Sequence, residues 1–258
     1  MQALVDAHCH LDFPAFTGRL DAVLARARAA GVSQCVIPGV RRADWARVRS
    51  VSEGHDGLWY CLGIHPWFVD EHDEADLQAL EQAVLARDSR CVAVGECGLD
   101  RLHGSLDAQQ PWFDRQVALA RDGDLPLVIH SVRTHDEVAA TLRRFRWRGR
   151  ALVHGFSGSV QQAQRLVELG CCIGVGGVIT HPRATRTRAA IKAIPEHALV
   201  LETDAPDMAP AGVAAGENAP EYLRQILSVL AELRATSPDQ LAPVLYDNTR
   251  RLFGWSGS

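Results

Sequence analysis

Lysine is nearly missing from this sequence. Only Lys192 among the 27 basic residues is a lysine, and 31 acidic residues give the chain a formal net charge of −4. A protein that holds nucleic acid through many phosphate contacts carries a strongly basic surface. The composition therefore excludes a broad electrostatic footprint of that kind, and any affinity for phosphate must be local.

Long apolar runs, a CxxC pair and a flexible linker are also missing. No run approaches the roughly 20 apolar residues that span a bilayer, and the opening residues lack a basic segment, so we expect no membrane helix and no signal peptide. The seven cysteines are odd in number, and most lie in or beside short apolar runs, which indicates small core residues in a reducing compartment. We expect a cytoplasmic, monomeric enzyme with a single domain over residues 1–258.

Two kinds of segment, predicted strands and predicted helices, alternate along the sequence. Short runs rich in Val, Ile and Cys alternate with stretches whose apolar residues recur every three or four positions, which is the pattern of βα units. We predict eight strands, at residues 3–8, 34–39, 58–64, 91–96, 127–130, 151–154, 172–176 and 199–203. Helices are predicted around 20–27 and 77–85 and at 107–121, 134–145, 160–169, 220–233 and 238–253. About 250 residues is typical of a single (β/α)8 TIM barrel, which is the fold we predict.

Polar side chains gather where these strands end. The C-terminal strand ends form the active face of such a barrel, and these ligand-type residues fall there: His8, His10, His65, Glu96, His130, His154 and Asp204. Side chains two positions apart on a strand point to the same side, so His8 and His10 form a pair of nitrogen ligands. The other histidines are expected on the surface: His55, His72, His103, His135, His181 and His197.

This constellation indicates a metal centre. Five imidazoles and two carboxylates are more than one ion needs, and they suit Zn, Mn, Fe or Co, while a carboxylate-bridged pair also suits Mg. We predict two divalent metal cations bridged by Glu96. His8, His10 and Asp204 complete one site, and His130 and His154 complete the other. Lys192 lies in a predicted helix away from any strand end, so a modified lysine does not form the bridge.

Catalytic roles follow from such a pair of ions. Two ions ~3.5–4 Å apart generate a hydroxide nucleophile and clamp the attacking and leaving oxygens of a phosphoryl displacement, with Asp204 as the candidate general base. His65, held before Pro66, is placed to bind or protonate a substrate oxygen, or is a structural loop histidine. The loop at 155–159, including Ser157, offers a phosphate seat or simply caps a helix.

Six segments in order resemble the TatD-type metal-dependent hydrolases. They are DAHCHLD at 6–12, GIHP at 63–66, GECGLD at 95–100, LPLVIHS at 125–131, HGFSG at 154–158 and ETDAP at 202–206. The resemblance implies an amidohydrolase-like TIM barrel, a binuclear metal centre, a cytoplasmic location and a nuclease that trims single-stranded DNA from the 3′ end. It implies the ligand roles given above. Glu202 is the other acidic residue of its motif, and we assign it to support of the site, with a catalytic role left open.

The chain departs from that family pattern in two places. Many members carry aromatic residues after the Gly-Leu-Asp motif, where this chain has Arg101, Leu102 and His103. Many place an arginine directly after His-Ser, where this chain has Val132, followed by Arg133. We therefore expect fewer aromatic side chains on which bases can stack. We also expect the phosphate-binding contact to be shifted or weakened, with Arg133 as the candidate residue that contacts phosphate.

Two reaction classes remain open. The leading one is hydrolysis of phosphodiesters at single-stranded DNA ends, with RNA also open, and the other is amidohydrolase-type cleavage of a small amide, ester or lactone. The same hydroxide attacks either phosphorus or a carbonyl carbon, but Arg101, Arg133 and the glycine–serine loop favour phosphate if they line the pocket. A non-catalytic binding protein is disfavoured because every expected ligand is present.

Overall fold

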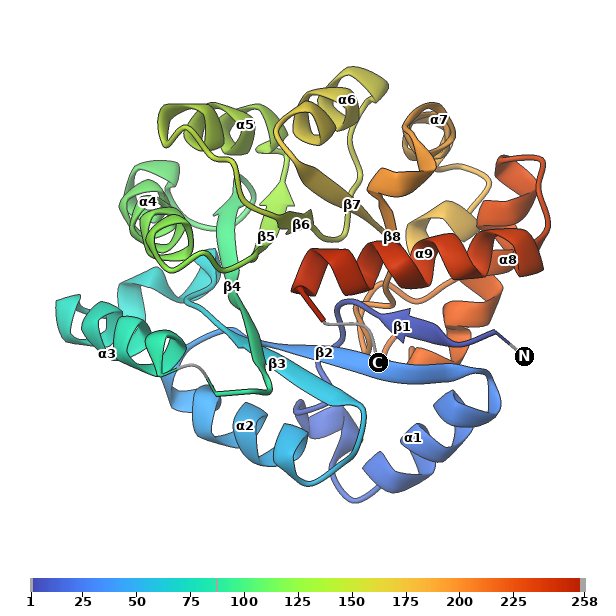
Figure 1. Ribbon diagram of the computed structural model, residues 1–258, viewed down its shortest axis with the longest axis horizontal. Helices are drawn as coiled ribbons and strands as arrows, with labels where there is room; N and C mark the ends of the chain where they lie inside the picture. The colour runs from blue at the N-terminus through green and yellow to red at the C-terminus, as the bar shows by residue number, and fades with distance from the viewer. Residues whose placement is uncertain (1, 87, 256–258) are drawn as a thin grey trace.

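A computed structural model describes residues 2–86 and 88–255. The strands of this part form one parallel sheet in the order β1 to β8, and helices alternate with them around a barrel (Figure 1). The strands are β1 (Leu4–Asp6), β2 (Val32–Gly39), β3 (Leu58–Leu62), β4 (Cys91–Asp100), β5 (Leu127–Val132), β6 (Ala151–Val153), β7 (Cys171–Val175) and β8 (Leu199–Leu201). Ala7 N donates to Leu201 O at 2.9 Å, which joins the last strand to the first. The predicted TIM barrel is confirmed.

The helices pack around the outside of the sheet. They are α1 (Leu20–Ala29), α2 (Trp45–Glu53), α3 (Glu74–Leu85), α4 (Leu106–Asp122), α5 (His135–Arg144), α6 (Val160–Glu168), α7 (Thr185–Ala193), α8 (Leu223–Leu233) and α9 (Pro238–Phe253). Capping boxes start several of them, such as Ser159 with Gln162 at α6, and Gly254 ends α9 with a φ of 70°. Among the described residues, none of the helices combines the length and apolar character needed to cross a bilayer.

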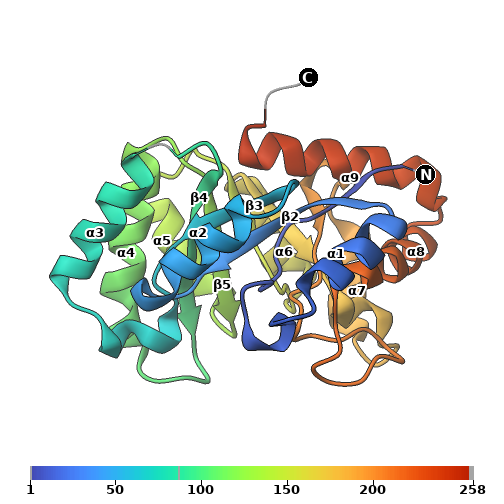
Figure 2. The same ribbon diagram turned by 90° about the horizontal axis from the view of Figure 1, so that it is seen from below.

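The core follows the two-residue period of the strands. Alternate strand residues pack together within the barrel, and their neighbours face the helices. The inner set comprises Val36, Cys61, Val128, Leu152 and Val200, with Leu252 and Phe253 of α9 packed against it. Figure 2 shows α9 lying across one end of the barrel. Asn248 of α9 donates to Glu196 O and Leu199 O, both at 2.7 Å, so this helix covers the end where β8 begins and leaves the opposite mouth open.

Two strand boundaries differ from prediction in ways that shape the mouth. β1 ends at Asp6, so His8 and His10 lie in the segment that follows it. β4 continues to Asp100, because its outer part pairs with β5 as far as Asp100 opposite Val132. The close pairing of β4 with β5 requires glycine at position 98. Gly98 has a φ of 140°, and a Cβ atom there would overlap with the carbonyl oxygen of His130. The extension places Asp100 beside His130.

Candidate metal centre

The histidine pair after β1 is anchored by a buried carboxylate. Asp6 accepts hydrogen bonds from Thr203 N at 2.9 Å and from Thr203 Oγ1 at 2.6 Å, which ties the end of β1 to the segment after β8. Beyond this anchor, His8 Nε2 and His10 Nε2 lie 3.3 Å apart. Each is 3.4 Å from Asp204 Oδ1. The three predicted ligands of the first ion therefore converge on one point.

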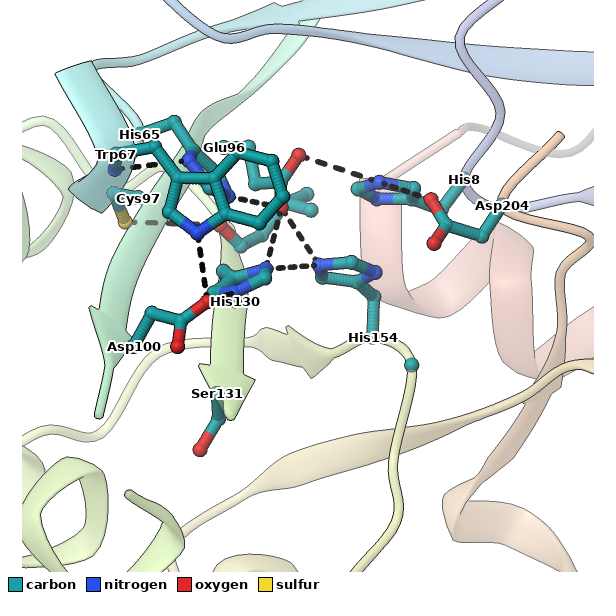
Figure 3. Close-up of polar contacts among 12 residues, drawn as sticks. His8, His65, Trp67, Glu96, Cys97, Asp100, His130, Ser131, His154 and Asp204 are labelled. Atoms are coloured by element: carbon teal, nitrogen blue, oxygen red, sulfur yellow. Dashed lines mark hydrogen bonds and ion pairs between the residues drawn. The ribbon is translucent and has the colours of Figure 1, made fainter. Parts of the chain in front are cut away.

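Glu96 stands at the centre of the constellation, as Figure 3 shows. Its Oε2 lies 3.4 Å from His8 Nε2 and 3.7 Å from His10 Nε2. Its Oε1 faces three further imidazoles, 3.3 Å from His65 Nε2, 3.1 Å from His130 Nδ1 and 2.7 Å from His154 Nε2. The two oxygens of one carboxylate thus face different nitrogen donors, and His8 and His154 stack beside it with ring centroids 3.8 Å apart.

The protonation states of His8, His65 and Glu96 suit metal binding. Burial lowers the pKa of His8 and of His65 to about 4, so both imidazoles are neutral near pH 7. Burial opposes ionisation of Glu96, but the surrounding imidazoles outweigh it and keep the pKa of this carboxyl well below its usual range. Neutral imidazoles and an ionised carboxylate are the forms that coordinate a divalent cation. The buried nitrogens of His8 and His10 also face each other, which fits a cation between them.

A second carboxylate, Asp100, supports His130. Its Oδ2 lies 3.0 Å from His130 Nε2 and accepts a hydrogen bond from Trp67 Nε1 at 2.7 Å. Burial opposes protonation of His130, but Asp100 and Glu96 raise its pKa to about 9. The same two carboxylates would stabilise a metal cation at Nδ1, because a cation there places positive charge where the proton does.

Trp67, Asp100 and Asp207 were not identified as site residues from the sequence. Asp100 closes the GECGLD segment and Trp67 follows Pro66, but their meeting depends on how β4 extends and how the loop after β3 folds back. A cavity of about 170 Å³ lies at the mouth. It is lined by His10, Phe13, Val40, His65, Trp67, Phe68, Glu96, His130, His154, Asp204 and Asp207. No arginine or lysine is among the described residues that line it.

The predicted phosphate contacts lie outside this cavity. Arg133 is exposed, has a φ of 55°, and accepts a hydrogen bond on its carbonyl from Arg101 Nε at 3.1 Å. Ser157 is exposed and does not line the cavity. Ser159 Oγ accepts from Gln162 N and caps α6, so the loop at 155–159 does perform the capping role. Lys192 lies exposed in α7, away from the mouth ligands, as expected.

Glu202 lies behind the cavity wall. It is completely buried, and its Oε1 accepts a hydrogen bond from Gly155 N at 2.5 Å, so it holds the turn that follows His154. A Cβ at Gly174 would lie 2.5 Å from the Glu202 carboxyl group, so β7 leaves room for this side chain only with glycine there. Burial, reinforced by Asp204, raises the pKa of Glu202 well above its usual range. This geometry suits support of the site.

One histidine expected on the surface is buried. His135 begins α5 and is 4% exposed, and its ring meets Phe156 edge-on with centroids 4.8 Å apart. Burial lowers its pKa to about 4. The prediction was wrong because the first turn of α5 lies beneath the loop after β6, which the sequence pattern does not show. The remaining five, His55, His72, His103, His181 and His197, are half-buried or exposed.

The described residues form a parallel eight-stranded barrel with buried imidazoles and carboxylates at its mouth. This combination is that of a metal-dependent hydrolase of the barrel class. A family model described as TatD related DNase matches residues 5–254. The chain belongs to the TatD family of metal-dependent hydrolases. The family resemblance seen in the six sequence segments is confirmed.

Individual relatives agree along nearly the whole chain. The uncharacterized metal-dependent hydrolase YjjV of Escherichia coli K12 is 45% identical over 252 residues, which cover 96% of this chain and 97% of the relative. The crystal structure of YjjV superposes with a TM-score of 0.92 at 44% identity and 98% coverage of both chains. The 3′-5′ ssDNA/RNA exonuclease TatD of Klebsiella pneumoniae is 33% identical and covers 97% of this chain and 98% of its own.

Proposed function

We propose that the protein hydrolyses phosphodiester bonds at the ends of single-stranded DNA, with RNA as a second candidate substrate, using two divalent cations. The observation that carries the proposal is the position of Glu96, whose oxygens face two distinct groups of imidazoles. Clusters able to hold an ion occur on both sides of it, with His8 and His10 on one side and His65 and His130 on the other. The exonuclease from Klebsiella pneumoniae supports the substrate class.

The ligands divide between the two oxygens of Glu96. His8, His10 and Asp204 would hold one ion on the Oε2 side, and His130 and His154 would hold the other on the Oε1 side. An imidazole-rich donor set favours Zn or Mn, with Mg as the third ion to test. When bound, such ions supply an activated water near neutral pH and neutralise charge on a phosphoryl oxygen.

Three side chains carry the remaining roles. Asp204 is the proposed general base, because its carboxylate lines the cavity and lies 3.4 Å from the ring nitrogens of both His8 and His10. His65 faces the cavity with a pKa of about 4, so at neutral pH it would hydrogen-bond a substrate oxygen as a neutral imidazole. Glu202 would hold the turn after His154 in place.

We expect the protein to contact only a short segment of the nucleic-acid strand. Since the described cavity wall has no arginine or lysine, binding should come from the metal centre and from rim contacts at Arg133 and Ser157. The salt dependence should then reflect only ~1–3 neutralised phosphates, at ~0.7 per phosphate for single strands. A terminus also enters the mouth of a barrel more easily than a passing strand, which favours cleavage at chain ends.

The same cavity favours a second candidate, cleavage of a small amide, ester or lactone. Its volume of about 170 Å³ and its aromatic walls would suit a compact carbonyl compound. No charged group beyond the metal centre would be needed for such a substrate, since a neutral carbonyl compound brings no phosphate to balance.

One incubation separates the two candidates. Protein reconstituted with Zn, Mn or Mg is mixed with end-labelled linear single-stranded DNA, circular single-stranded DNA, RNA and a panel of small esters, amides and lactones at two salt concentrations. We expect linear strands to shorten from one end while circles stay intact, with a shallow salt dependence. Efficient nicking of circles or a steep salt dependence would show an extended groove, and turnover confined to the small compounds would favour the carbonyl reaction.

We also propose a cytoplasmic, monomeric enzyme. All seven cysteines are free, which suits a reducing compartment. The ligand groups around Glu96 come from a single chain, so the site needs no second copy to be complete.

A further inference from the structure

Trp67 is an unusually placed aromatic residue. It belongs to the 3-10 helix η3 (Pro66–Glu71), which follows β3 at the mouth of the barrel, and it is 47% exposed although it lines the cavity. Its ring centroid lies only 6.2 Å from that of His130, one of the proposed metal ligands. A large apolar surface therefore remains open to solvent beside the proposed reaction centre.

The indole is fixed on one face and one edge. His103 stacks on it with ring centroids 4.7 Å apart and an angle of 20° between the planes. The ring nitrogen is held by the carboxylate of Asp100, at 2.7 Å, and Figure 3 shows this bond reaching down from the ring to Asp100. His65 and His130 meet the ring at steep angles, with centroids 5.2 Å and 6.2 Å away. Because Trp67 is still 47% exposed and lines the cavity, part of its aromatic surface remains accessible there to a ligand.

The surroundings suit a planar ring attached to an anion. Phe13, Val40 and Phe68 line the same cavity as Trp67 and offer apolar contacts. The imidazoles and carboxylates around Glu96 lie next to them and are where a phosphate would meet the metal centre. Within a nucleotide, a nucleobase and its phosphate have this combination of an apolar face and a nearby negative charge.

We propose that Trp67 is the stacking platform for the nucleobase next to the scissile phosphate, backed by His103 and oriented by Asp100. The inference rests on the proposed nuclease function and adds how that function selects its substrate. Base–aromatic stacking tolerates every base because each has a π-face, so the platform senses the presence of a base and not its identity.

The bond to Asp100 links the platform to the metal centre. The same Oδ2 atom that holds the Trp67 ring lies 3.0 Å from His130 Nε2. Removing the ring and removing its N–H donor are therefore different perturbations. Trp67→Ala removes both, whereas Trp67→Phe keeps an aromatic face and removes only the hydrogen bond to Asp100.

The test uses pairs of linear single-stranded oligonucleotides that differ only in the terminal nucleotide, which carries either a base or an abasic tetrahydrofuran. Wild-type protein should cleave the base-bearing end with a kcat/KM roughly tenfold or more higher, mostly through KM. In Trp67→Ala this ratio should fall to about one. Trp67→Phe should keep most of the ratio while kcat falls for both substrates. Leu85→Ala, an exposed apolar residue at the end of α3, is the matched control and should keep the wild-type ratio.

A binding measurement complements the kinetics. Deoxyadenosine monophosphate should quench tryptophan fluorescence in the wild type but not in Trp67→Phe, and deoxyribose 5-phosphate should quench neither. Equal cleavage of base-bearing and abasic ends by the wild type would overturn the platform while leaving the nuclease proposal standing. If the wild type cleaves no oligonucleotide, the nuclease proposal fails. In that case, quenching confined to the base-bearing monophosphate would still support Trp67 as a ring platform, and its absence would overturn the platform too.

Discussion

The two sides of the barrel mouth are built differently. On the β1 and β8 side, main-chain bonds join the ligand segments directly, since Asp204 N donates to His8 O at 2.9 Å and His10 N donates to Ala205 O at 2.7 Å, and the Asp6 carboxylate adds to them. On the β3 to β5 side, His65 N donates to Val40 O at 2.8 Å, but side chains contribute more of the positioning. Asp100 holds His130, and Gln116 brackets the peptide before His65 by donating to Ile64 O at 3.0 Å and accepting from Ile64 N at 2.8 Å.

This contrast shows where the site can change without losing the fold. A substitution on the β1 and β8 side leaves the backbone bonds in place, so the ligand positions persist even when one ligand is altered. A substitution among the supporting side chains of the β3 to β5 side moves a ligand without touching it. We therefore expect differences in substrate preference among relatives to concentrate around Trp67 and Asp100.

Glu96 belongs to both sides, and its loss should have the largest effect. Glu96→Ala removes the carboxylate that faces both groups of imidazoles, so hydrolysis should fall by at least ~10³-fold, and fewer than two ions should stay tightly bound. Elemental analysis after gel filtration measures the metal content. Two tightly held ions in this variant would contradict the bridging role, and Glu96→Gln, which keeps the shape, controls for collapse of the cavity.

Asp204→Asn tests the β1 and β8 side alone. Asp204 Oδ1 lies 3.4 Å from both His8 Nε2 and His10 Nε2, and the amide would keep the contacts but could not accept a proton. Turnover should drop by at least ~10²-fold. Circular dichroism and thermal unfolding of the metal-free protein should match the wild type, because the backbone bond from Asp204 to His8 is retained. Near wild-type hydrolysis would place the base elsewhere.

Asp100→Asn tests the β3 to β5 side. The amide keeps the size of the side chain but loses the charge that stabilises positive charge on His130. Metal affinity or activity should fall by ~10–100-fold, the range for partners that orient a ligand. Chelator competition measures the affinity. Asp114→Asn, a carboxylate of α4 paired with Arg144 on the outside, is the control, and an equal loss in both variants would show a general effect of charge.

His135 lies outside both sides of the mouth and should affect stability alone. Its folded pKa of about 4 lies below the ordinary value of 6.5, so between these values the unfolded chain binds a proton that the folded chain does not. Stability is therefore lost as the pH falls from about 6.5 towards 4.

The variant His135→Leu cannot bind that proton. Between pH 7.5 and pH 5, the free energy of unfolding decreases in both proteins, but we expect the decrease to be about 1–2 kcal/mol smaller in the variant than in the wild type. Urea titrations at the two pH values measure this difference. His197→Leu, at an exposed position, should behave as the wild type. Equal pH dependence in all three proteins would show that His135 accepts a proton in the folded state.

The sequence predicted which side chains meet at the mouth, because a parallel barrel brings all carboxyl ends of its strands to one end. His8, His130 and Asp204 needed only the strand order to be placed together. Their supporting partners depend on details that periodicity does not carry. Asp100 reaches His130 because β4 runs four residues further than its apolar pattern, and Trp67 reaches Asp100 through a short 3-10 helix.

Residues at the rim show a further limit of sequence reasoning. Arg133 and Ser157 follow strand ends as the ligands do, but both are exposed and neither lines the cavity, because the loops after the strands set their positions. Strand register determines which way a side chain points only while the strand continues. His135 shows the converse, since a polar residue in a helix start is buried by a loop packed over it.

The seam between β1 and β8 gives the proposed first ion a mechanical role. Its ligands come from the two ends of the chain, His8 and His10 from the beginning and Asp204 from beyond the last strand, so they meet only after the ring has closed. A cation held there would link the first and last strands of the barrel through its ligands. Because only the closed ring binds it tightly, a free concentration of 100 times Kd would add about 2.7 kcal/mol to the closed state. The supply of metal would then set the stability of the fold as well as the rate of hydrolysis.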